Sequence, residues 1–370
     1  MTYDLIVVGA GIVGLAHAYT AALRGWRVAV VERDHRCIGA SVRNFGFVTV
    51  TGQRAGDTWR RALRSREVWA EVADRARIPI EHQGLWVLAR RRSARAVLEA
   101  FAAGPMGEDC VLYEPHEAAQ RMPVLRTEGA SAALYSPHEL RVESREAIAR
   151  LAAWLSERHG VAFLFAEAVL DVQPHVVRTS RRKLHGGRVV ICPGSDLTGV
   201  AAAALAHRAL RLTRLQMLRV RPHAGFRLTA AVMGDLSLVR YAGYAALPQA
   251  RVLRDELSSE VPQSLAHGIH LIAVQSSDGT LVVGDSHHDD ASPLPFSSEE
   301  IDRCILRHLR ETLDLGECEV VERWIGTYPV GHSEDSLVEA PDPSVRVVLV
   351  TSGTGASTAF GLAEDVLRAW

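Results

Sequence analysis

The hydrophobic pattern at the start of the chain predicts a strand, a helix and a second strand in close succession. Residues 3–8 form an apolar, β-branched run typical of a buried parallel strand. Residues 12–24 carry small and apolar side chains at the spacing of a packed helix, and residues 27–32 form the next strand-like run. Together these segments make one βαβ unit of about 30 residues, the size of a mononucleotide-binding half.

Two kinds of segment alternate along the rest of the chain. Helical segments and fully apolar runs of the kind found in an α/β domain lie at residues 57–76, 144–159, 189–192, 345–351 and 357–370. Short strand-like segments, separated by Pro and Gly, lie at residues 84–89, 111–114, 132–136, 216–220, 270–275 and 281–284, with a helix at 298–313. This alternation predicts that the chain enters each of two domains more than once.

The predicted fold is therefore α/β plus α+β, with two interleaved domains. We expect a Rossmann-like dinucleotide-binding domain from residues 1–77, 144–207 and 323–370. The remaining residues, 78–143 and 208–322, are expected to form an antiparallel-sheet domain that binds the substrate. A length of 370 residues favours two domains, because a single hydrophobic core stops growing at about 250–300 residues.

Composition limits the range of partners. Charged residues make up 23% of the chain and the net charge is −1, so no nucleic-acid partner is implied. The apolar start, residues 5–23, lacks a basic n-region and is interrupted by glycines, so we expect it to fold rather than act as a signal peptide. No other apolar run reaches the roughly 18 residues of a membrane span. The five scattered cysteines suit a reducing compartment, and we expect a cytoplasmic protein without a membrane partner.

The strongest chemical signal is the motif Gly9-Ala10-Gly11-Ile12-Val13-Gly14, between the first predicted strand and helix. Gly9 permits a tight turn, Gly11 lets backbone amides approach a pyrophosphate, and Gly14 lets the helix pack closely on the sheet. Glu32 follows Gly14 by 18 residues, where it would accept hydrogen bonds from ribose hydroxyls, and Arg33 adjoins it. The motif predicts a dinucleotide site and leaves NAD and FAD open.

Three further segments resemble the FAD-binding pattern of the D-amino acid oxidase and glycine oxidase family, and the resemblance spans most of the chain. They are Gly39-Ala40-Ser41-Val42-Arg43-Asn44-Phe45-Gly46, Pro193-Gly194 after an apolar strand, and Ser352-Gly353-Thr354-Gly355-Ala356-Ser357-Thr358. The resemblance implies that the first segment wraps the flavin and that the last places a positive helix end near flavin N1. It also implies cofactor contacts at Val169 and Gly326. We expect the FAD to be noncovalent, because no cysteine lies near 324–329 or 353–355.

Two residues of the first segment allow alternative roles. Asn44 is the only asparagine of the chain, and its amide would either bond a flavin edge or hold the loop as a turn-forming residue before Phe-Gly. Arg43 is either a phosphate or substrate contact or a solvated loop charge.

The segment 323–329 resembles the family's Gly-x-Arg-Pro segment, whose arginine holds the α-carboxylate of an amino acid. Tyr328 stands at the position of that arginine. A tyrosine cannot make a bidentate fork to a carboxylate, so a standard α-amino acid is disfavoured as the substrate. Segments 41–46 and 284–288 are similar to a subgroup associated with phosphonate catabolism, which implies 2-aminoethylphosphonate-like amines.

A phosphonate would need several donors, each of which is equally open to a structural role. The candidates are Arg43, Tyr241, Tyr244, Tyr328, His287 and His288, and we predict that Tyr328, Tyr241, Tyr244 and His287 are catalytic. His287 and His288 stand beside Asp289 and Asp290, but consecutive residues point to opposite faces of a strand. We therefore expect no metal site.

These features predict an enzyme that oxidises a small amine by hydride transfer to flavin N5. Water would hydrolyse the imine to an aldehyde or keto product, and molecular oxygen or another carrier would accept the electrons. One alternative is oxidation of a 2-hydroxy acid, with His287 or His332 as the base. A second alternative is a non-catalytic FAD-binding electron relay, which an exposed, flat flavin edge would favour over a closed chamber.

Overall fold

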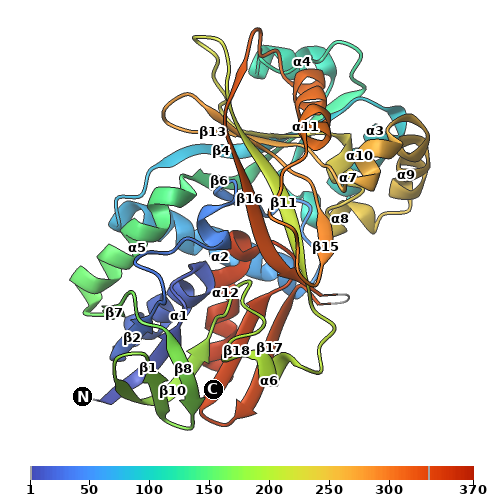
Figure 1. Ribbon diagram of the computed structural model, residues 1–370. Helices are drawn as coiled ribbons and strands as arrows, with labels where there is room; N and C mark the ends of the chain where they lie inside the picture. The colour runs from blue at the N-terminus through green and yellow to red at the C-terminus, as the bar shows by residue number, and fades with distance from the viewer. Residues whose placement is uncertain (1, 332–333) are drawn as a thin grey trace.

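The computed structural model describes residues 2–331 and 334–370 of the chain. Two sheets organise the molecule, one in the lower part of Figure 1 and one in the upper part. Both termini lie at the lower end in this view. The structure thus has the mixed α/β plus α+β architecture that the hydrophobic pattern predicts.

The first sheet has eight strands and is largely parallel. Its main path runs through β17 (Ser336–Asp342), β18 (Val345–Val350), β10 (Lys183–Ile191), β1 (Thr2–Val8), β2 (Val28–Val31) and β7 (Ala162–Leu164). The strands β9 (Val176–Thr179) and β8 (Val169–Gln173) extend from β10. Strand β1 pairs in parallel with both β10 and β2, which places the glycine motif at the carboxyl end of the central strand.

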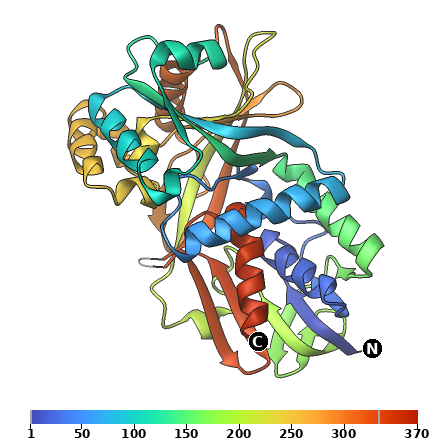
Figure 2. The ribbon, with the colours of Figure 1, turned by 180° about the vertical axis from the view of Figure 1, so that it is seen from behind.

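Strand β1 is apolar throughout because both of its faces are covered. Leu5 and Val7 pack into one core, whereas Ile6 between them packs into the core on the opposite face. Four helices build the first core: α1 (Ile12–Leu23), α2 (Asp57–Arg75), α5 (Ser144–His159) and α12 (Gly355–Arg368). Figure 2 shows α2, in light blue, crossing α12, in red. The short helix α6 (Ala202–Leu205) contributes to the other core.

The second sheet has ten strands. Its main path runs through β15 (His288–Asp290), β11 (Arg211–Arg221), β14 (Leu281–Gly284), β13 (Ile272–Gln275), β12 (Ala231–Met233), β4 (Ile80–Ala89), β6 (Ala132–Val142) and β3 (Phe47–Val48). Strand β16 (Glu319–Val330) pairs with β11, and β5 (Val111–Tyr113) pairs with β6. Most of these pairs are antiparallel, as the alternating pattern predicts.

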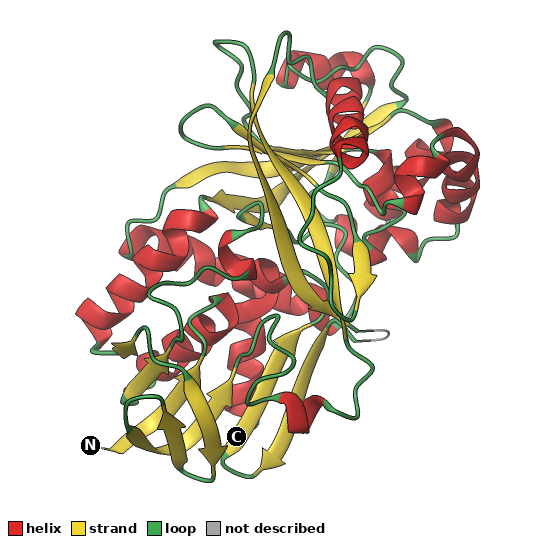
Figure 3. Ribbon diagram, in the orientation of Figure 1, coloured by secondary structure: helices red, strands yellow, loops and turns green. Residues whose placement is uncertain are grey.

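Helices gather at the outer end of the second sheet, as Figure 3 shows. They are α3 (Arg92–Ala102), α4 (Pro115–Arg121), α7 (Asp235–Leu238), α8 (Ala242–Ala245), α9 (Gln249–Glu260), α10 (Pro262–Ala266) and α11 (Glu299–Thr312). Two single 3-10 turns, Ala40–Val42 and Pro105–Gly107, complete the elements. Over the described ranges, we find no helix with the length and apolar character that a membrane crossing demands.

One predicted domain boundary needs correction. A boundary at residue 323 would cut β16, yet this strand pairs with β11 along its length, from Arg221↔Glu319 to Arg211↔Val330. Residues 323–330 therefore belong to the second sheet, because backbone pairing to β11 continues past Gly326 and Pro329. Strand β3, predicted within the first domain, also pairs in the second sheet.

Candidate active site

A cavity of about 440 Å³ is lined by both parts of the molecule. Most of the predicted cofactor residues line it, namely Gly11, Ile12, Val13, Gly14, Ala40, Ser41, Arg43, Asn44, Gly194, Gly326, Gly353, Thr354, Gly355, Ala356 and Ser357. Three of the predicted substrate residues, Tyr241, His287 and Tyr328, line the same cavity. The structure thus brings the glycine motif of the first sheet and the substrate candidates of the second sheet into one space.

The glycine motif forms a compact turn between β1 and α1. A Cβ atom on Gly14 would lie 2.0 Å from the carbonyl oxygen of Gly9, so only a glycine lets the helix start this close to the strand. The first turn of α1 contains no acidic residue, and its N-cap, Gly11, provides no side-chain cap. The Ile12 N–H donates to Ser41 Oγ, and the rest of the first turn presents the positive end of the helix dipole to the cavity, where it favours an anion.

Glu32 fixes this turn to the end of β2. Its Oε2 atom accepts a hydrogen bond from the Ala10 N–H at 2.9 Å, and its Oε1 atom accepts one from the Asp34 N–H at 3.1 Å. The carboxylate therefore supports the glycine turn, and its contact with a ribose stays a prediction.

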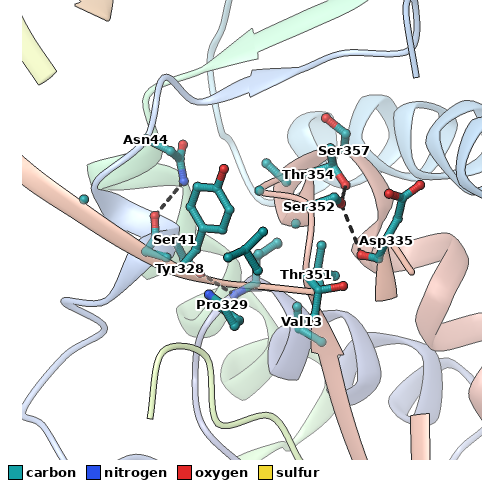
Figure 4. A pocket seen from close by; sticks show the side chains of 18 of the residues that line it. Val13, Ser41, Asn44, Tyr328, Pro329, Asp335, Thr351, Ser352, Thr354 and Ser357 are labelled. Atoms are coloured by element: carbon teal, nitrogen blue, oxygen red, sulfur yellow. Dashed lines mark hydrogen bonds between the residues drawn. The ribbon is translucent and has the colours of Figure 1, made fainter. Parts of the chain in front are cut away.

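A second helix N-terminus reaches the cavity at α12. The preceding turn includes Gly353 with φ 73°, and a Cβ atom there would lie 2.7 Å from Cζ of Tyr328. The first turn of α12 again lacks an acidic residue, and its N-cap, Thr354, makes no side-chain cap. Figure 4 shows the Tyr328 ring between Asn44 on one side and the turn from Ser352 to Ser357 on the other. Tyr328 therefore lies between the loop at Asn44 and the turn before α12.

Asn44 holds its own loop. Its Nδ2 atom donates to the Ala40 carbonyl at 2.9 Å, and its Oδ1 atom accepts from the Gly46 N–H at 2.7 Å. These contacts support the loop-holding alternative. Arg43 is exposed at the cavity, and its carbonyl oxygen accepts a hydrogen bond from Trp324 Nε1 at 3.1 Å.

Several predicted residues do not line the cavity. Tyr244 is fully buried against the Phe101 ring and Gly52 and does not line the cavity, so the structure gives its predicted catalytic role no support. Arg33 instead pairs with Asp196 at 2.8 Å on the surface. His288 lies against His267, with Nε2 3.2 Å from His267 Nδ1. His332 lies outside the described residues.

The remaining predicted cofactor residues do not line the cavity either. They are Gly9, Glu32, Gly46, Val169, Pro193 and Thr358. Thr358 is buried, and its hydroxyl donates to the Thr354 carbonyl within α12. Gly46 packs on the Val142 carbonyl, where a Cβ atom would lie 1.8 Å away. The cofactor contacts of these positions stay predictions.

A buried cluster of ionisable side chains forms the substrate end of the cavity. His270 Nε2 lies 3.0 Å from Asp285 Oδ1, and His287 Nε2 lies 3.8 Å from Asp285 Oδ2. The two imidazole rings stack at 24° with their centroids 5.2 Å apart. All three residues line the cavity, and their side chains are at most 8% exposed.

Burial and charge set the protonation of this cluster. Burial lowers the pKa of His287 well below its ordinary value, so its imidazole is neutral near pH 7. Burial alone would raise the pKa of the Asp285 carboxyl, but His287, His270 and Arg240 together lower it below its ordinary value. The cluster therefore presents a carboxylate beside a neutral imidazole.

Phenols and a guanidinium complete this end of the cavity. Burial raises the pKa of Tyr328 to about 12, although the nearby Arg240 lowers it, so the hydroxyl stays a hydrogen-bond donor. Burial likewise raises the pKa of Tyr241, whose ring meets the His270 ring edge to face at 5.6 Å. Arg240 lines the cavity from the connection between α7 and α8.

Sequence reasoning missed His270, Asp285 and Arg240. His270 and Asp285 exchange both backbone hydrogen bonds, at 3.3 and 3.0 Å, just beyond β13 and β14. The register of β13 with β14, extended from Ile272↔Gly284, would place His270 opposite Ser286, so the pair with Asp285 lies one residue out of register and strand pairing alone does not predict it. Arg240 gives no local signal, because the chain is rich in arginine.

The chain belongs to the DAO family, whose model is described as FAD dependent oxidoreductase and matches residues 4–369. The protein is therefore an enzyme that uses FAD, and the predicted cofactor and fold class are confirmed.

Solved structures of several oxidoreductases are similar over the whole chain. Glycine oxidase from Geobacillus kaustophilus is 19% identical, with a TM-score of 0.77 over 99% of this chain and 94% of that one. L-proline dehydrogenase from P. horikoshii is 17% identical, with a TM-score of 0.77 over 100% and 94%. L-alpha-glycerophosphate oxidase from Mycoplasma pneumoniae, solved with FAD bound, is 16% identical, with a TM-score of 0.74 over 100% and 95%. A search of curated proteins gave no match.

The residues of the cavity suit FAD. The close turn at Gly14 and the acid-free first turn of α1 provide the amides that a pyrophosphate requires. The acid-free start of α12 provides a second positive helix end, which suits the electron-rich pyrimidine edge of a flavin. Ser41, whose Oγ accepts a hydrogen bond from the Ile12 N–H at 2.9 Å, joins the loop after β2 to the glycine turn.

Proposed function

We propose that the protein oxidises the C–N bond of a small amine that carries an anionic group, with an aminophosphonate-like compound favoured over a standard α-amino acid. The observation that carries this proposal is Tyr328. Strand β16 contributes Gly326, Thr327, Tyr328, Pro329 and Val330 to the cavity, so this strand offers a phenol and no guanidinium. A phenol gives a single hydrogen bond and cannot hold a carboxylate as a fork.

The anionic group of the substrate would be held from a different direction. Arg240 comes from the α7–α8 connection, and Tyr241 and Tyr328 are donors on the same side of the cavity. A phosphonate has three acceptor oxygens, so it can accept hydrogen bonds from several separate donors at once. Arg43, exposed at the cavity, is a further cation for this group.

FAD, when bound, accepts a hydride from the carbon that carries the amine. The protein residues orient that carbon, because an anchored anionic group beside Tyr241 and Tyr328 leaves the substrate few positions. Water then hydrolyses the imine product of this step to an aldehyde or keto product. Molecular oxygen or another carrier takes up the electrons.

The cysteines support noncovalent FAD. Cys192 lines the cofactor end of the cavity, but burial strongly raises the pKa of its thiol, which keeps it from acting as a nucleophile. All five cysteines are free thiols in the structure, and the cytoplasmic location stays a prediction.

The substitution Tyr328→Arg tests this proposal. The new guanidinium is expected to lower kcat/KM for 2-aminoethylphosphonate at least about tenfold and to raise it for glycine or alanine, because it restores a carboxylate fork. The measurement is anaerobic bleaching of the flavin with each amine, followed by steady-state kinetics. Arg33→Lys serves as the control for a surface arginine change. An unchanged substrate profile would remove Tyr328 from the substrate site.

A second candidate is oxidation of a 2-hydroxy acid, which the neutral imidazole of His287 beside Asp285 supports. Removing a hydroxyl proton needs a base, and a neutral histidine in the cavity is suited to that role. The same bleaching experiment separates the two candidates. If 2-hydroxy acids bleach the flavin and no amine does, the amine proposal fails.

A further inference from the structure

Three side chains with metal-binding chemistry converge at the substrate end of the cavity. One ligand atom from each of His270, Asp285 and His287 lies within 4.8 Å of the other two. The chain just beyond β13 and β14 brings them together. His270 and Asp285 exchange backbone hydrogen bonds, and the ring of His287, two residues after Asp285, stacks on the ring of His270.

The outer contacts of both histidines leave Nε2 as the free ligand atom. His287 Nδ1 lies 3.0 Å from the Gly268 carbonyl, which can only accept, so Nδ1 carries the proton. Ser237 Oγ donates to the Leu271 carbonyl at 3.1 Å and is left to accept from His270 Nδ1 at 3.4 Å. Both Nε2 atoms then have lone pairs beside the Asp285 carboxylate. A carbonyl or hydroxyl partner on the outer nitrogen is the usual support of a metal-binding histidine.

The spacing of the ligand atoms suits a small divalent ion. Bonds of about 2.0–2.1 Å in a tetrahedral arrangement separate two ligand atoms by about 3.4 Å. His270 Nε2 lies 3.0 Å from Asp285 Oδ1 and His287 Nε2 lies 3.8 Å from Asp285 Oδ2, so each imidazole is near that distance from one carboxylate oxygen. Asp285 Oδ1 contacts His270 Nε2 without the alignment of a hydrogen bond and has no other polar partner among the described residues. A buried carboxylate oxygen of this kind needs a partner.

We propose that His270, Asp285 and His287 bind one divalent metal ion of the zinc class, with an open coordination position that faces the cavity. Two imidazole nitrogens and one carboxylate form a ligand set that zinc accepts, and three protein ligands leave a fourth position for a small molecule. The sequence-based expectation of no metal site concerns the neighbours His287 and His288. His288 does point away, to His267, and the third ligand comes instead from pairing across the strands.

The ion would supply the positive charge that Tyr328 does not. Without it, the carboxylate of Asp285 offsets the nearby guanidinium of Arg240, which leaves this end of the cavity close to neutral. With a divalent ion bound, the same end carries about two positive charges, enough to match a phosphonate dianion. This role as an anchor for the anionic group rests on the proposed function, whereas the binding of the ion does not.

The test uses Zn²⁺ alone on the FAD-loaded enzyme after treatment with a chelator. Competition with a coloured chelator is expected to show one Zn²⁺ bound per chain. His287→Ala and Asp285→Asn should each weaken that binding at least about 100-fold, and Ser237→Ala should weaken it roughly tenfold through the outer contact of His270. Bound flavin, measured by absorbance, verifies that each variant remains folded.

His288→Ala is the matched control, because this histidine is the sequence neighbour of His287 but lies against His267. The control should bind Zn²⁺ as the unsubstituted enzyme does. No saturable Zn²⁺ binding in the folded enzyme, or equal binding by the His287→Ala and Asp285→Asn variants, overturns the proposal. Loss of binding in His288→Ala alone would place the ion at a different site and also overturn it.

Activity separates this inference from the proposed function. If amines bleach the flavin and Zn²⁺ does not bind, the metal site fails and the amine oxidation stands. If Zn²⁺ binds at these residues and no amine bleaches the flavin, the proposed substrate fails and the metal site stands. If both hold, Zn²⁺ should lower KM for 2-aminoethylphosphonate more than KM for an uncharged amine, and equal effects would exclude the anchoring role.

Discussion

The two walls of the cavity are built in opposite ways. The cofactor wall consists mainly of short contiguous segments: the turns at Gly14 and Gly353, each between a strand and a helix, and the loop at Asn44, which precedes β3. The substrate wall takes single residues from separate places, among them Arg240, His270, Asp285 and Tyr328. The first wall presents mainly backbone amides to the cavity, whereas the second wall presents side chains.

This difference explains why one wall is conspicuous in the sequence and the other is not. A site made of backbone amides needs glycines and helix starts at fixed spacing, which is a local pattern. A site made of converging side chains needs only that distant strands pair in a given register. Substitutions in the two walls are therefore expected to have effects of different kinds and sizes.

The largest effect is expected for Gly14→Val on the cofactor wall. The Cβ atom alone would lie 2.0 Å from the Gly9 carbonyl oxygen, so the helix cannot keep its position. We expect FAD binding to weaken at least about 100-fold, measured as the ratio of flavin to protein after gel filtration. Gly39→Ala is the control, because its Cβ would meet nothing within 4 Å. Normal flavin content in Gly14→Val would show that this close contact is unimportant.

An intermediate effect is expected from two buried histidines, one in each part of the molecule. Burial lowers the pKa of His17 in α1 to about 4, and burial with the nearby Arg141 lowers that of His82 in β4 to about 3. Below the ordinary value near 6.5 the unfolded chain binds a proton that the folded chain does not, so stability falls as the pH drops toward 4.

Each histidine should cost about 2 kcal/mol of unfolding free energy between pH 7 and pH 5, measured by urea unfolding. His82→Gln should remove the contribution that the substrate part makes to the pH dependence of the unfolding free energy. His17→Gln should remove the contribution of the cofactor part. The slopes against pH are compared rather than the absolute stabilities, because each substitution also alters packing. If the unsubstituted protein and both variants show the same slope of unfolding free energy against pH, the two histidines are not the source of the dependence.

The smallest effect is expected at Arg33. This side chain is 59% exposed and pairs with Asp196 on the surface, where such pairs contribute little. Arg33→Ala should change FAD affinity less than about threefold. Glu32→Gln, the neighbouring substitution, should weaken FAD binding about tenfold, because the Glu32 carboxylate holds the Ala10 N–H of the glycine turn. A larger effect at Arg33 than at Glu32 would mean that Arg33 contacts the cofactor directly.

The sequence by itself determined the fold class and the glycine turn, because these depend on local periodicity and on glycines at fixed spacing. The choice of FAD over NAD came from the resemblance to the D-amino acid oxidase and glycine oxidase family. The sequence also predicted α5 as residues 144–159, the span that the structure shows. The tertiary structure decided the rest. Strand β16 pairs in the second sheet, Tyr244 is buried in the core, and His270 lies opposite Asp285. Strand partners and side-chain directions depend on contacts between segments far apart in the chain, and no local pattern encodes them.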